Sequence, residues 1–160
     1  MIRIFTIGVY NSTEEEFFSK LINHKIHFFC DIRQRRGVRG SLYKFVNSNY
    51  LQIKLHELGI QYIYIKELAP TNEIREKQKN ADKLNRETKK QRTHLGFIFE
   101  QEYKKQIIEN FNFDNFLKEF SSIEDVNIVF FCVEEHASAC HRSLVARKAC
   151  EILNINPINL

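Results

Sequence analysis

The sequence predicts a three-layer α/β fold, in which helices cover both faces of a mainly parallel sheet of four to five strands. Short segments rich in branched and aromatic residues alternate with segments of helical periodicity. The connections between them are short, and successive strands are joined through a helix, as parallel strands require. The length of 160 residues predicts one domain over 1–160 that buries its core without disulfides.

Five apolar segments are predicted strands. They are, in chain order, Ile2–Gly8, Ile26–Ile32, Ile60–Leu68, Val126–Val133 and a short final Ile155–Leu160. The fourth is an apolar run interrupted only by Asn127, which predicts a central position because central parallel strands are buried on both faces. The chain has 14 phenylalanines and no tryptophan, so phenylalanine is expected to fill the core.

Helical periodicity marks the segments between the strands. Ser12 and Glu15 form a predicted capping box for the first helix, and the second spans Ser48–Leu58 and stops at Gly59. The later helices are predicted over Leu95–Phe111, Asn112–Ser121 and Ala139–Leu153. The apolar residues that share one face of a predicted helix, and are therefore expected to be buried, are Phe17, Phe18, Leu21, Ile22, Leu51, Leu55, Leu58, Phe99, Tyr103, Ile107, Val145, Ala149, Ile152 and Leu153.

A basic segment at about 71–94 interrupts this alternation. It holds eight Lys or Arg against four Asp or Glu, a surplus of four that equals the net charge of +4 for the whole chain. Its polarity predicts a solvated insertion, helical or partly disordered. The alternative is an arm that closes over a substrate or follows a nucleic-acid backbone.

The composition narrows the class of protein. A sequence pI near 8.9 permits a polyanionic partner without requiring one. The four cysteines show no Cys-x-x-Cys spacing, which argues against a redox dithiol or a zinc knuckle, and Cys30 and Cys132 are expected to be buried thiols. Neither a secretory signal nor a membrane-length apolar run is present, so we expect a cytoplasmic protein with no membrane partner. The sequence leaves the oligomeric state open.

An arginine-rich loop follows the second strand. It contains Asp31, Arg33, Arg35, Arg36 and Arg39, together with two glycines. Ligands of open parallel sheets bind beyond the carboxyl ends of the strands, and arginine forks match phosphate or carboxylate. We therefore predict that these five residues, with Tyr10 after the first strand, bind substrate. The alternative is a solvated basic loop in which Asp31 orients one of the arginines.

Reactive side chains gather where the fourth strand meets the last helix. Cys140 is expected in the first helical turn, where the helix dipole favours a thiolate. It is either a nucleophile or a small packed residue. A tyrosine-phosphatase loop would need arginine six positions later, where the chain has Ala146, and no glycine follows to form a rhodanese-like cradle.

The neighbours of Cys140 suggest further roles. Glu134 and His141 are predicted to transfer protons, which makes Glu134, Cys140 and His141 the candidate catalytic residues. Arg142 is predicted either to bind a phosphate or to lock the turn in a buried ion pair with Glu134 or Asp31. Zinc-ligand residue types are present at Cys132, Glu134, His136, Cys140 and His141. Their spacing matches no common zinc pattern and Cys132 is expected to point into the core, so neither a metal nor a cofactor is predicted.

Four motifs together resemble one family. They are Thr6-Ile7-Gly8, Asp31-Ile32-Arg33, Glu67-Leu68 and Cys132-x-Glu134 followed by Cys140-His141-Arg142. Over nearly the whole chain they resemble the domain of unknown function 488 family, small bacterial and archaeal proteins with an α/β fold. The chain departs from the family pattern at Val9-Tyr10-Asn11, where the family often has His-Ser, and at Gln34-Arg35-Arg36, where it usually has a proline. The resemblance implies the fold and groups Arg33, Glu134, Cys140, His141 and Arg142 into one site, but implies no reaction.

These observations lead to three functional hypotheses. The first is an anion-binding α/β domain that acts on or binds a phosphate-bearing substrate, such as a nucleotide or nucleic acid; as an enzyme it would be a hydrolase or transferase. The second is a noncatalytic polyanion-binding module in which Cys-His-Arg is a structural latch. The third is a cysteine-dependent transferase or hydrolase.

Overall fold

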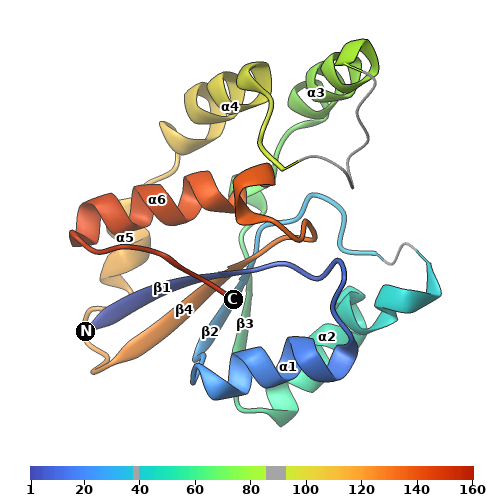
Figure 1. The fold of residues 1–160 in the computed structure, drawn as a ribbon. Coiled ribbons are helices and arrows are strands. Elements are labelled where there is room, and N and C mark those ends of the chain that lie inside the picture. Colours follow the sequence, from blue (N-terminus) through green and yellow to red (C-terminus); the bar gives the residue numbers. More distant parts are fainter. Residues whose placement is uncertain (38–39, 86–92) are drawn as a thin grey trace.

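A five-stranded, all-parallel sheet forms the centre of the protein in this computed structural model, which describes residues 1–37, 40–85 and 93–160. The strand order is β3-β2-β4-β1-β5 (Figure 1). The strands are β1 (Ile2–Ile7), β2 (Phe28–Asp31), β3 (Gln61–Tyr64), β4 (Val126–Phe131) and β5 (Ile158–Asn159). Every residue of β4 is buried, which confirms its predicted central position and the predicted parallel sheet.

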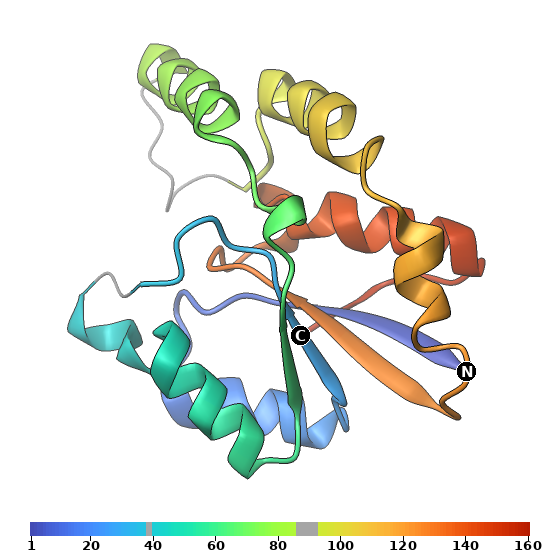
Figure 2. The same cartoon turned by 180° about the vertical axis from the view of Figure 1, so that it is seen from behind.

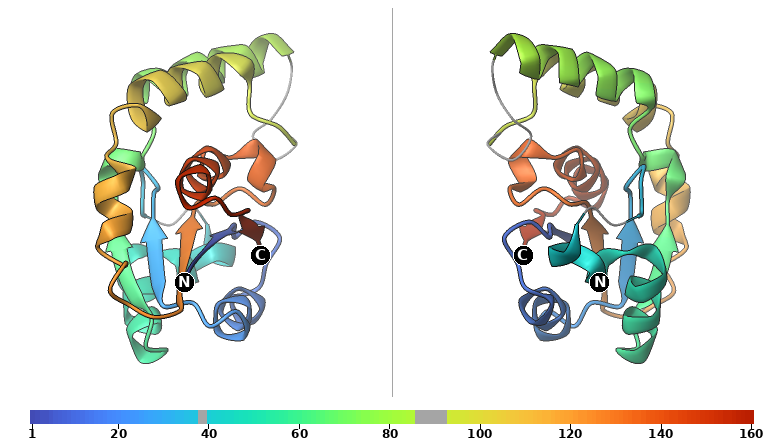
Figure 3. Two further views of the ribbon diagram at one scale, coloured as in Figure 1. Left: turned by 90° about the vertical axis from the view of Figure 1, so that its left-hand side faces the viewer. Right: turned by 90° about the vertical axis from the view of Figure 1, so that its right-hand side faces the viewer.

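Helices cover both faces of this sheet, as predicted. One face carries α1 (Glu14–Asn23) and α2 (Ser48–Glu57), and the other carries α5 (Phe113–Lys118) and α6 (Arg142–Leu153). Figure 1 and the end-on views of Figure 3 show the three layers. Strand alternation divides the core accordingly: Phe130 packs on the α6 face and Phe131 on the α1 face.

Phenylalanine fills much of this core. The Phe17 ring of α1 packs against Phe29, Phe45 and Phe131, with ring centroids 5.5 to 6.2 Å apart. Such tilted and edge-to-face contacts are the preferred geometries for aromatic pairs. The concentration of phenylalanine in the sequence is thus explained by packing.

The first helix begins one residue later than predicted. Thr13 is its N-cap and Glu16 the reciprocal residue, with the Glu16 N–H donating to Thr13 Oγ1 at 3.2 Å and the Thr13 N–H to Glu16 Oε2 at 2.8 Å. The predicted pair, Ser12 and Glu15, is wrong because the Ser12 N–H is used in a turn, donating to the Val9 carbonyl oxygen at 3.0 Å.

Three residues assigned to buried helix faces are exposed. Ile22, Leu58 and Ile152 are 52%, 38% and 39% exposed. Each lies in the last turn of its helix or directly after it. Helical periodicity alone does not show where the opposing surface ends. Gly59 does stop α2 as predicted, at a φ of +71°.

The third strand is shorter than predicted, and part of the basic insertion forms a helix. The strand ends at Tyr64, and a 3₁₀ turn follows at Lys66–Leu68. The insertion then forms α3 (Asn72–Asn85), which confirms a helical interpretation, while its residues 86–92 lie outside the described part of the chain. Buried Ile74 anchors α3 to the core, so this helix is not wholly solvated.

The helix pair α3 and α4 (Phe97–Tyr103) projects beyond the carboxyl edge of the sheet. Figures 1 and 2 show the two helices side by side above α6. The chain continues from α4 into a π-helical turn at Lys104–Ile108. In the described part of the chain, no helix combines the length and the apolar character that crossing a membrane would need.

The connection from β4 to α6 contains the main correction to the predicted elements. A 3₁₀ turn at Ala137–Ala139 comes first, Cys140 is extended with φ −134° and ψ 144°, and α6 begins only at Arg142. Cys140 is therefore outside the first helical turn. The Cys140 N–H donates to the Ala137 carbonyl oxygen at 3.0 Å. Cys140 is therefore positioned by the 3₁₀ turn and not by the helix.

Candidate functional site

A cavity of about 590 Å³ opens at the carboxyl edge of the sheet. The loops after β1, β2 and β4 contribute Tyr10, Arg33 and Glu134 to its lining, and Cys140 and His141 before α6 complete that side. These loops line one crevice, as predicted, because the strands of a parallel sheet all end at the same edge. Helix α3 lines the cavity with Gln78, Arg75 and Lys79.

Gly8 allows the loops after β1 and β4 to approach closely. A Cβ atom at this position would lie 1.9 Å from the Glu134 carbonyl oxygen. The N–H groups of Val9 and Tyr10 both donate to the Val133 carbonyl oxygen, at 3.2 and 3.1 Å. The absence of a side chain at Gly8 is therefore a condition for placing Glu134 at the cavity wall.

Arg142 holds the β4–α6 turn from inside. Its Nη1 donates to the Glu134 carbonyl oxygen at 2.6 Å and its Nη2 to the Glu135 carbonyl oxygen at 2.9 Å. The residue is 1% exposed. These contacts lock the turn, but through main-chain oxygens, whereas the prediction was an ion pair with the carboxylate of Glu134 or Asp31. The same burial keeps the guanidinium away from a substrate in the cavity.

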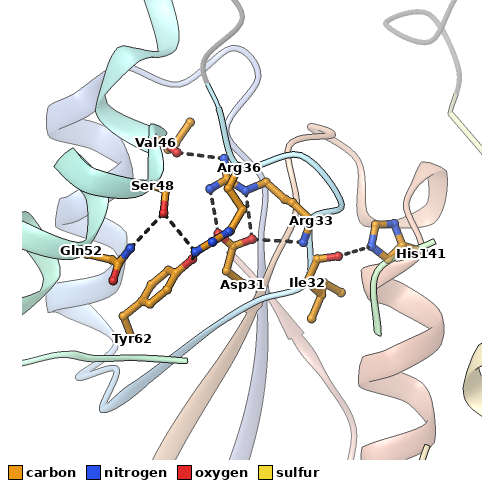
Figure 4. A network of polar contacts seen from close by, with 9 residues as sticks. All are labelled: Asp31, Ile32, Arg33, Arg36, Val46, Ser48, Gln52, Tyr62 and His141. Atoms are coloured by element: carbon orange, nitrogen blue, oxygen red, sulfur yellow. Dashed lines mark hydrogen bonds and ion pairs between the residues drawn. The ribbon is translucent and has the colours of Figure 1, made fainter. Parts of the chain in front are cut away.

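Asp31 and Arg33 form a buried ion pair at the end of β2, shown in Figure 4. Asp31 Oδ1 accepts from Arg33 Nε at 2.9 Å, and Oδ2 accepts from Nη2 at 2.7 Å. Arg33 Nη1 donates to the Val46 carbonyl oxygen at 2.9 Å, and Tyr62 Oη donates to Asp31 Oδ2 at 2.8 Å. Burial, helped by the Asp31 charge, raises the pKa of Tyr62 to about 12. The prediction that Asp31 orients an arginine is confirmed.

The other predicted arginines do not gather at one point. Arg36 turns away from the cavity, with its guanidinium 3.9 Å from the centroid of the Tyr64 ring and Nη1 donating to Ser48 Oγ at 3.1 Å. Arg35 is exposed and lines the cavity. Arg39 lies outside the described residues. The loop therefore offers Arg35 at the cavity. Arg33 lines the cavity too but is held in the ion pair with Asp31, and Arg36 is engaged within the fold.

Tyrosines shape the cavity mouth. Tyr10, a predicted binding residue, packs against Tyr43 with ring centroids 5.3 Å apart, and both line the cavity. Sequence reasoning missed Tyr43, since it lies in an irregular 3₁₀ segment with no motif around it. It also missed Gln78, whose only sequence signal was its place in the basic segment that was considered as a covering arm.

Cys140 and His141 form a close pair at the cavity. Cys140 Sγ lies 3.7 Å from His141 Nδ1, and His141 Nε2 lies 3.0 Å from the Ile32 carbonyl oxygen. Burial opposes a thiolate here. A hydrogen bond from Cys132 and the charges of His141 and Arg142 nevertheless hold the pKa of Cys140 well below its usual value.

Cys132 belongs to the same group. It is 7% exposed, so it is buried as predicted, but it also lines the cavity. Ligand atoms of Cys132, Cys140 and His141 all lie within 4.8 Å of one another. His136, considered as a ligand from the sequence, lies on the surface with its Nε2 3.9 Å from Glu135 Oε2. Two thiols and one imidazole are thus the residues of this site that could hold a metal.

Comparison with known proteins gives one family. No curated protein and no solved structure matches the chain. The family model of the domain of unknown function DUF488 matches residues 13–149, which include the Asp31–Arg33 pair, Glu134 and the Cys140-His141-Arg142 sequence. The chain therefore belongs to the DUF488 family.

Proposed function

We propose that this protein is a hydrolase or transferase that acts on a phosphate-bearing substrate in the cavity, with Cys140 and His141 at its reactive centre. The supporting observation is that a close thiol–imidazole pair lines a 590 Å³ cavity at the carboxyl edge of a parallel sheet. Ligands of such sheets bind at this edge. Cavities of roughly 300–1,000 Å³ are typical of small-molecule sites.

The size of the cavity favours a nucleotide-sized substrate over a nucleic-acid duplex. Its reactive residues are almost fully buried: Cys140 is 2% and His141 6% exposed. A duplex would have to present its phosphates on an outer surface, whereas a small molecule can reach these groups inside the cavity. Single nucleotides and other small phosphate esters are therefore the first compounds to test.

The rim carries the side chains that suit a phosphate. Arg35, Arg75 and Lys79 line the cavity, and cationic side chains attract anionic groups entering it. Glu76 and Asp82 line it as well, so the rim is mixed in charge and suits a substrate that also offers hydrogen-bond donors.

Gln78 supports recognition of such a substrate. The side chain is 7% exposed and donates through Nε2 to Asp82 Oδ1. Its Oε1 is buried and has no hydrogen-bond partner in the described part of the chain. A buried acceptor without a partner is costly, so a rotation of the Gln78 side chain toward a donor group of the substrate would relieve this cost.

Glu134 is the proposed proton-transfer residue. It is 5% exposed, lines the cavity and has its main chain fixed by Arg142. A carboxyl group that lines the same cavity as the reactive pair is suited to activate a water or hydroxyl nucleophile, or to protonate a leaving group.

The third hypothesis, a cysteine-dependent enzyme, uses the same residues. Cys140 would attack the substrate directly, forming a bond from Sγ to the electrophilic atom while the leaving group takes a proton from Glu134. The 3.7 Å approach of His141 Nδ1 favours this candidate, because an imidazolium at that position stabilises the thiolate. Trapping a covalent adduct on Cys140 by mass spectrometry distinguishes it from direct transfer to water.

A substrate panel tests the proposal. Nucleotides, phosphomonoesters, phosphodiesters and short DNA and RNA would be assayed for binding by calorimetry and for turnover by product chromatography. Glu134→Gln is expected to lower turnover by roughly 10²- to 10⁴-fold, the usual contribution of acid–base catalysis, and Cys140→Ser to lower it further. Cys150→Ser, the same change at a buried cysteine in α6, is the control.

Two results would contradict the proposal. The first is the absence of binding by every phosphate compound at low salt, where electrostatic binding is strongest. The second is undiminished turnover in both Glu134→Gln and Cys140→Ser. Salt-dependent binding of DNA or RNA without turnover would instead support the noncatalytic polyanion-binding hypothesis.

A further inference from the structure

Cys132, Cys140 and His141 bring three metal-ligand atoms to one wall of the cavity. Their Sγ, Sγ and nitrogen atoms lie within 4.8 Å of one another, and all three residues are buried. We propose that these residues bind a soft divalent metal ion, for which Zn²⁺ is best suited, with its fourth coordination position facing the cavity. Thiolate and imidazole ligands in this combination select zinc over the hard ions Mg²⁺ and Ca²⁺.

The spacing of the donors fits a tetrahedral ion. Zinc–sulfur bonds of about 2.3 Å and zinc–nitrogen bonds of about 2.1 Å, at a tetrahedral angle, place the two donors about 3.6 Å apart. Cys140 Sγ and His141 Nδ1 are 3.7 Å apart. The third donor, Cys132 Sγ, is close enough that a small side-chain adjustment suffices to complete the set.

The Ile32 carbonyl oxygen fixes the tautomer of His141. This oxygen only accepts, so the 3.0 Å contact assigns a proton to His141 Nε2. In the neutral ring, Nδ1 then has its lone pair directed toward the thiols. Metal-binding histidines commonly donate their second ring N–H to a carbonyl or carboxylate, which fixes the ring for coordination. Ile32 therefore supports His141 as a metal ligand.

The fold holds the three residues in place before any ion binds. The Cys132 N–H donates to the Ile7 carbonyl oxygen at 3.3 Å, which continues the β4 ladder to the cavity. Strand alternation directs Cys132 to the α6 face, where Phe130 also packs, and Arg142 fixes the turn that leads to Cys140. Long-range contacts thus bring together residues eight and nine positions apart, which explains why local sequence spacing did not predict the site.

A metal ion would also neutralise the negative charges of Cys132 and Cys140 as thiolates. Two neighbouring thiolates in a buried place repel each other and are costly to desolvate. A divalent cation neutralises both. Tyr103 closes one side, with its ring centroid 5.3 Å from that of His141 and its hydroxyl bound to the Leu68 carbonyl oxygen. The open direction is the cavity, which all three proposed ligands line.

Three protein ligands with one open position are the pattern of catalytic zinc. In this protein the ion would polarise a phosphoryl oxygen or supply a bound water of lowered pKa in the cavity that Glu134 also lines. This catalytic use rests on the proposed function, whereas metal binding itself does not. With the ion bound, Cys140 acts as a ligand, and with the ion removed it is free to react as a thiol.

Cobalt titration tests the site. Reduced, chelator-treated full-length protein would be titrated with Co²⁺, which reports thiolate ligation by a sulfur-to-cobalt charge-transfer band and tetrahedral geometry by intense visible bands. Zn²⁺ would then displace it. The unmodified protein and Cys150→Ser are expected to bind one ion per chain, and Cys132→Ser, Cys140→Ser and His141→Ala to bind it more than about tenfold more weakly. Circular dichroism identifies any variant that does not fold.

The unmodified protein alone decides the test if the variants fail to fold. Absence of the charge-transfer band and of zinc retention in the reduced, folded protein overturns the metal site. Retained affinity in a folded Cys132→Ser or Cys140→Ser variant overturns this ligand set. These measurements need no substrate, so loss of the metal site is distinguishable from failure of the phosphate-substrate panel.

Discussion

His141 Nε2 lies 3.0 Å from the carbonyl oxygen of Ile32, and this contact ties the α6 side of the site to the end of β2. The two residues are 109 positions apart in sequence. Ile32 lies between Asp31 and Arg33 in the sequence. The ring of His141 is therefore positioned by the same segment that forms the Asp31–Arg33 ion pair. The site therefore depends on this contact between the turn before α6 and the segment after β2.

Replacing His141 tests this dependence. His141→Ala removes the donor to a buried carbonyl oxygen, and we expect a loss of about 1–3 kcal/mol in the free energy of unfolding. His136→Ala is the matched control, because His136 lies in the same turn but its side chain is 56% exposed. Urea denaturation measures both. Equal stability of the two variants would show that the contact with Ile32 contributes nothing.

Breaking the Asp31–Arg33 pair is expected to be strongly destabilising. Arg33→Met leaves a buried carboxylate with Tyr62 and one main-chain N–H as partners, and loss of one member of a buried pair typically costs about 3–5 kcal/mol. The exposed Lys54–Glu57 pair is the control; Lys54→Met should cost less than about 1 kcal/mol. Denaturation midpoints compare the two, and similar losses would contradict the role assigned to burial.

Arg142 is predicted to act through its geometry as well as its charge. Arg142→Lys keeps the charge but loses the fork that binds the Glu134 and Glu135 carbonyl oxygens, so the turn should loosen and both stability and Co²⁺ affinity should fall. Arg147→Lys, at a more exposed position of α6, is the control. A lysine variant that behaves like the unmodified protein would show that the fork is unnecessary.

Gly8→Ala should displace the loop that carries Glu134. The added Cβ would lie 1.9 Å from the Glu134 carbonyl oxygen, and relief requires main-chain movement, for which about 1–3 kcal/mol is typical. Gly37→Ala, where the added atom meets nothing within 4 Å, is the control. Thermal unfolding and turnover would both be measured. A neutral Gly8→Ala variant would contradict the close approach of the two loops.

Thiol labelling is expected to depend on pH differently at two cysteines of the metal-free protein. The lowered pKa of Cys140 keeps its thiolate populated as the pH falls below the usual cysteine pKa, so its labelling should persist there. Burial raises the pKa of Cys150 to about 11, so its labelling should require alkaline pH. Iodoacetamide labelling with peptide mass spectrometry compares them. Loss of Cys140 labelling at the same pH as Cys150 would contradict the difference.

The predicted elements are confirmed where the sequence signal is local. The central strand predicted at Val126–Val133 is confirmed at Val126–Phe131, because a strand buried on both faces carries mainly apolar side chains. The predicted helical start at Ala139 is wrong, because a 3₁₀ turn and an extended residue use the same residue types as a helix start. Ile22 failed for another reason: periodicity gives the direction of a side chain but not the extent of the surface opposite.

The sequence by itself determined the α/β class, the parallel sheet and the edge at which Asp31, Glu134 and Cys140 meet, because alternation and short connections restrict the topology. Only the tertiary structure decided what each group does there. It paired Arg33 with Asp31, bonded Arg142 to two carbonyl oxygens, and brought Cys132 close to Cys140 and His141. Partner choice of this kind depends on distances between residues remote in sequence, which are fixed only when the strands and α6 pack.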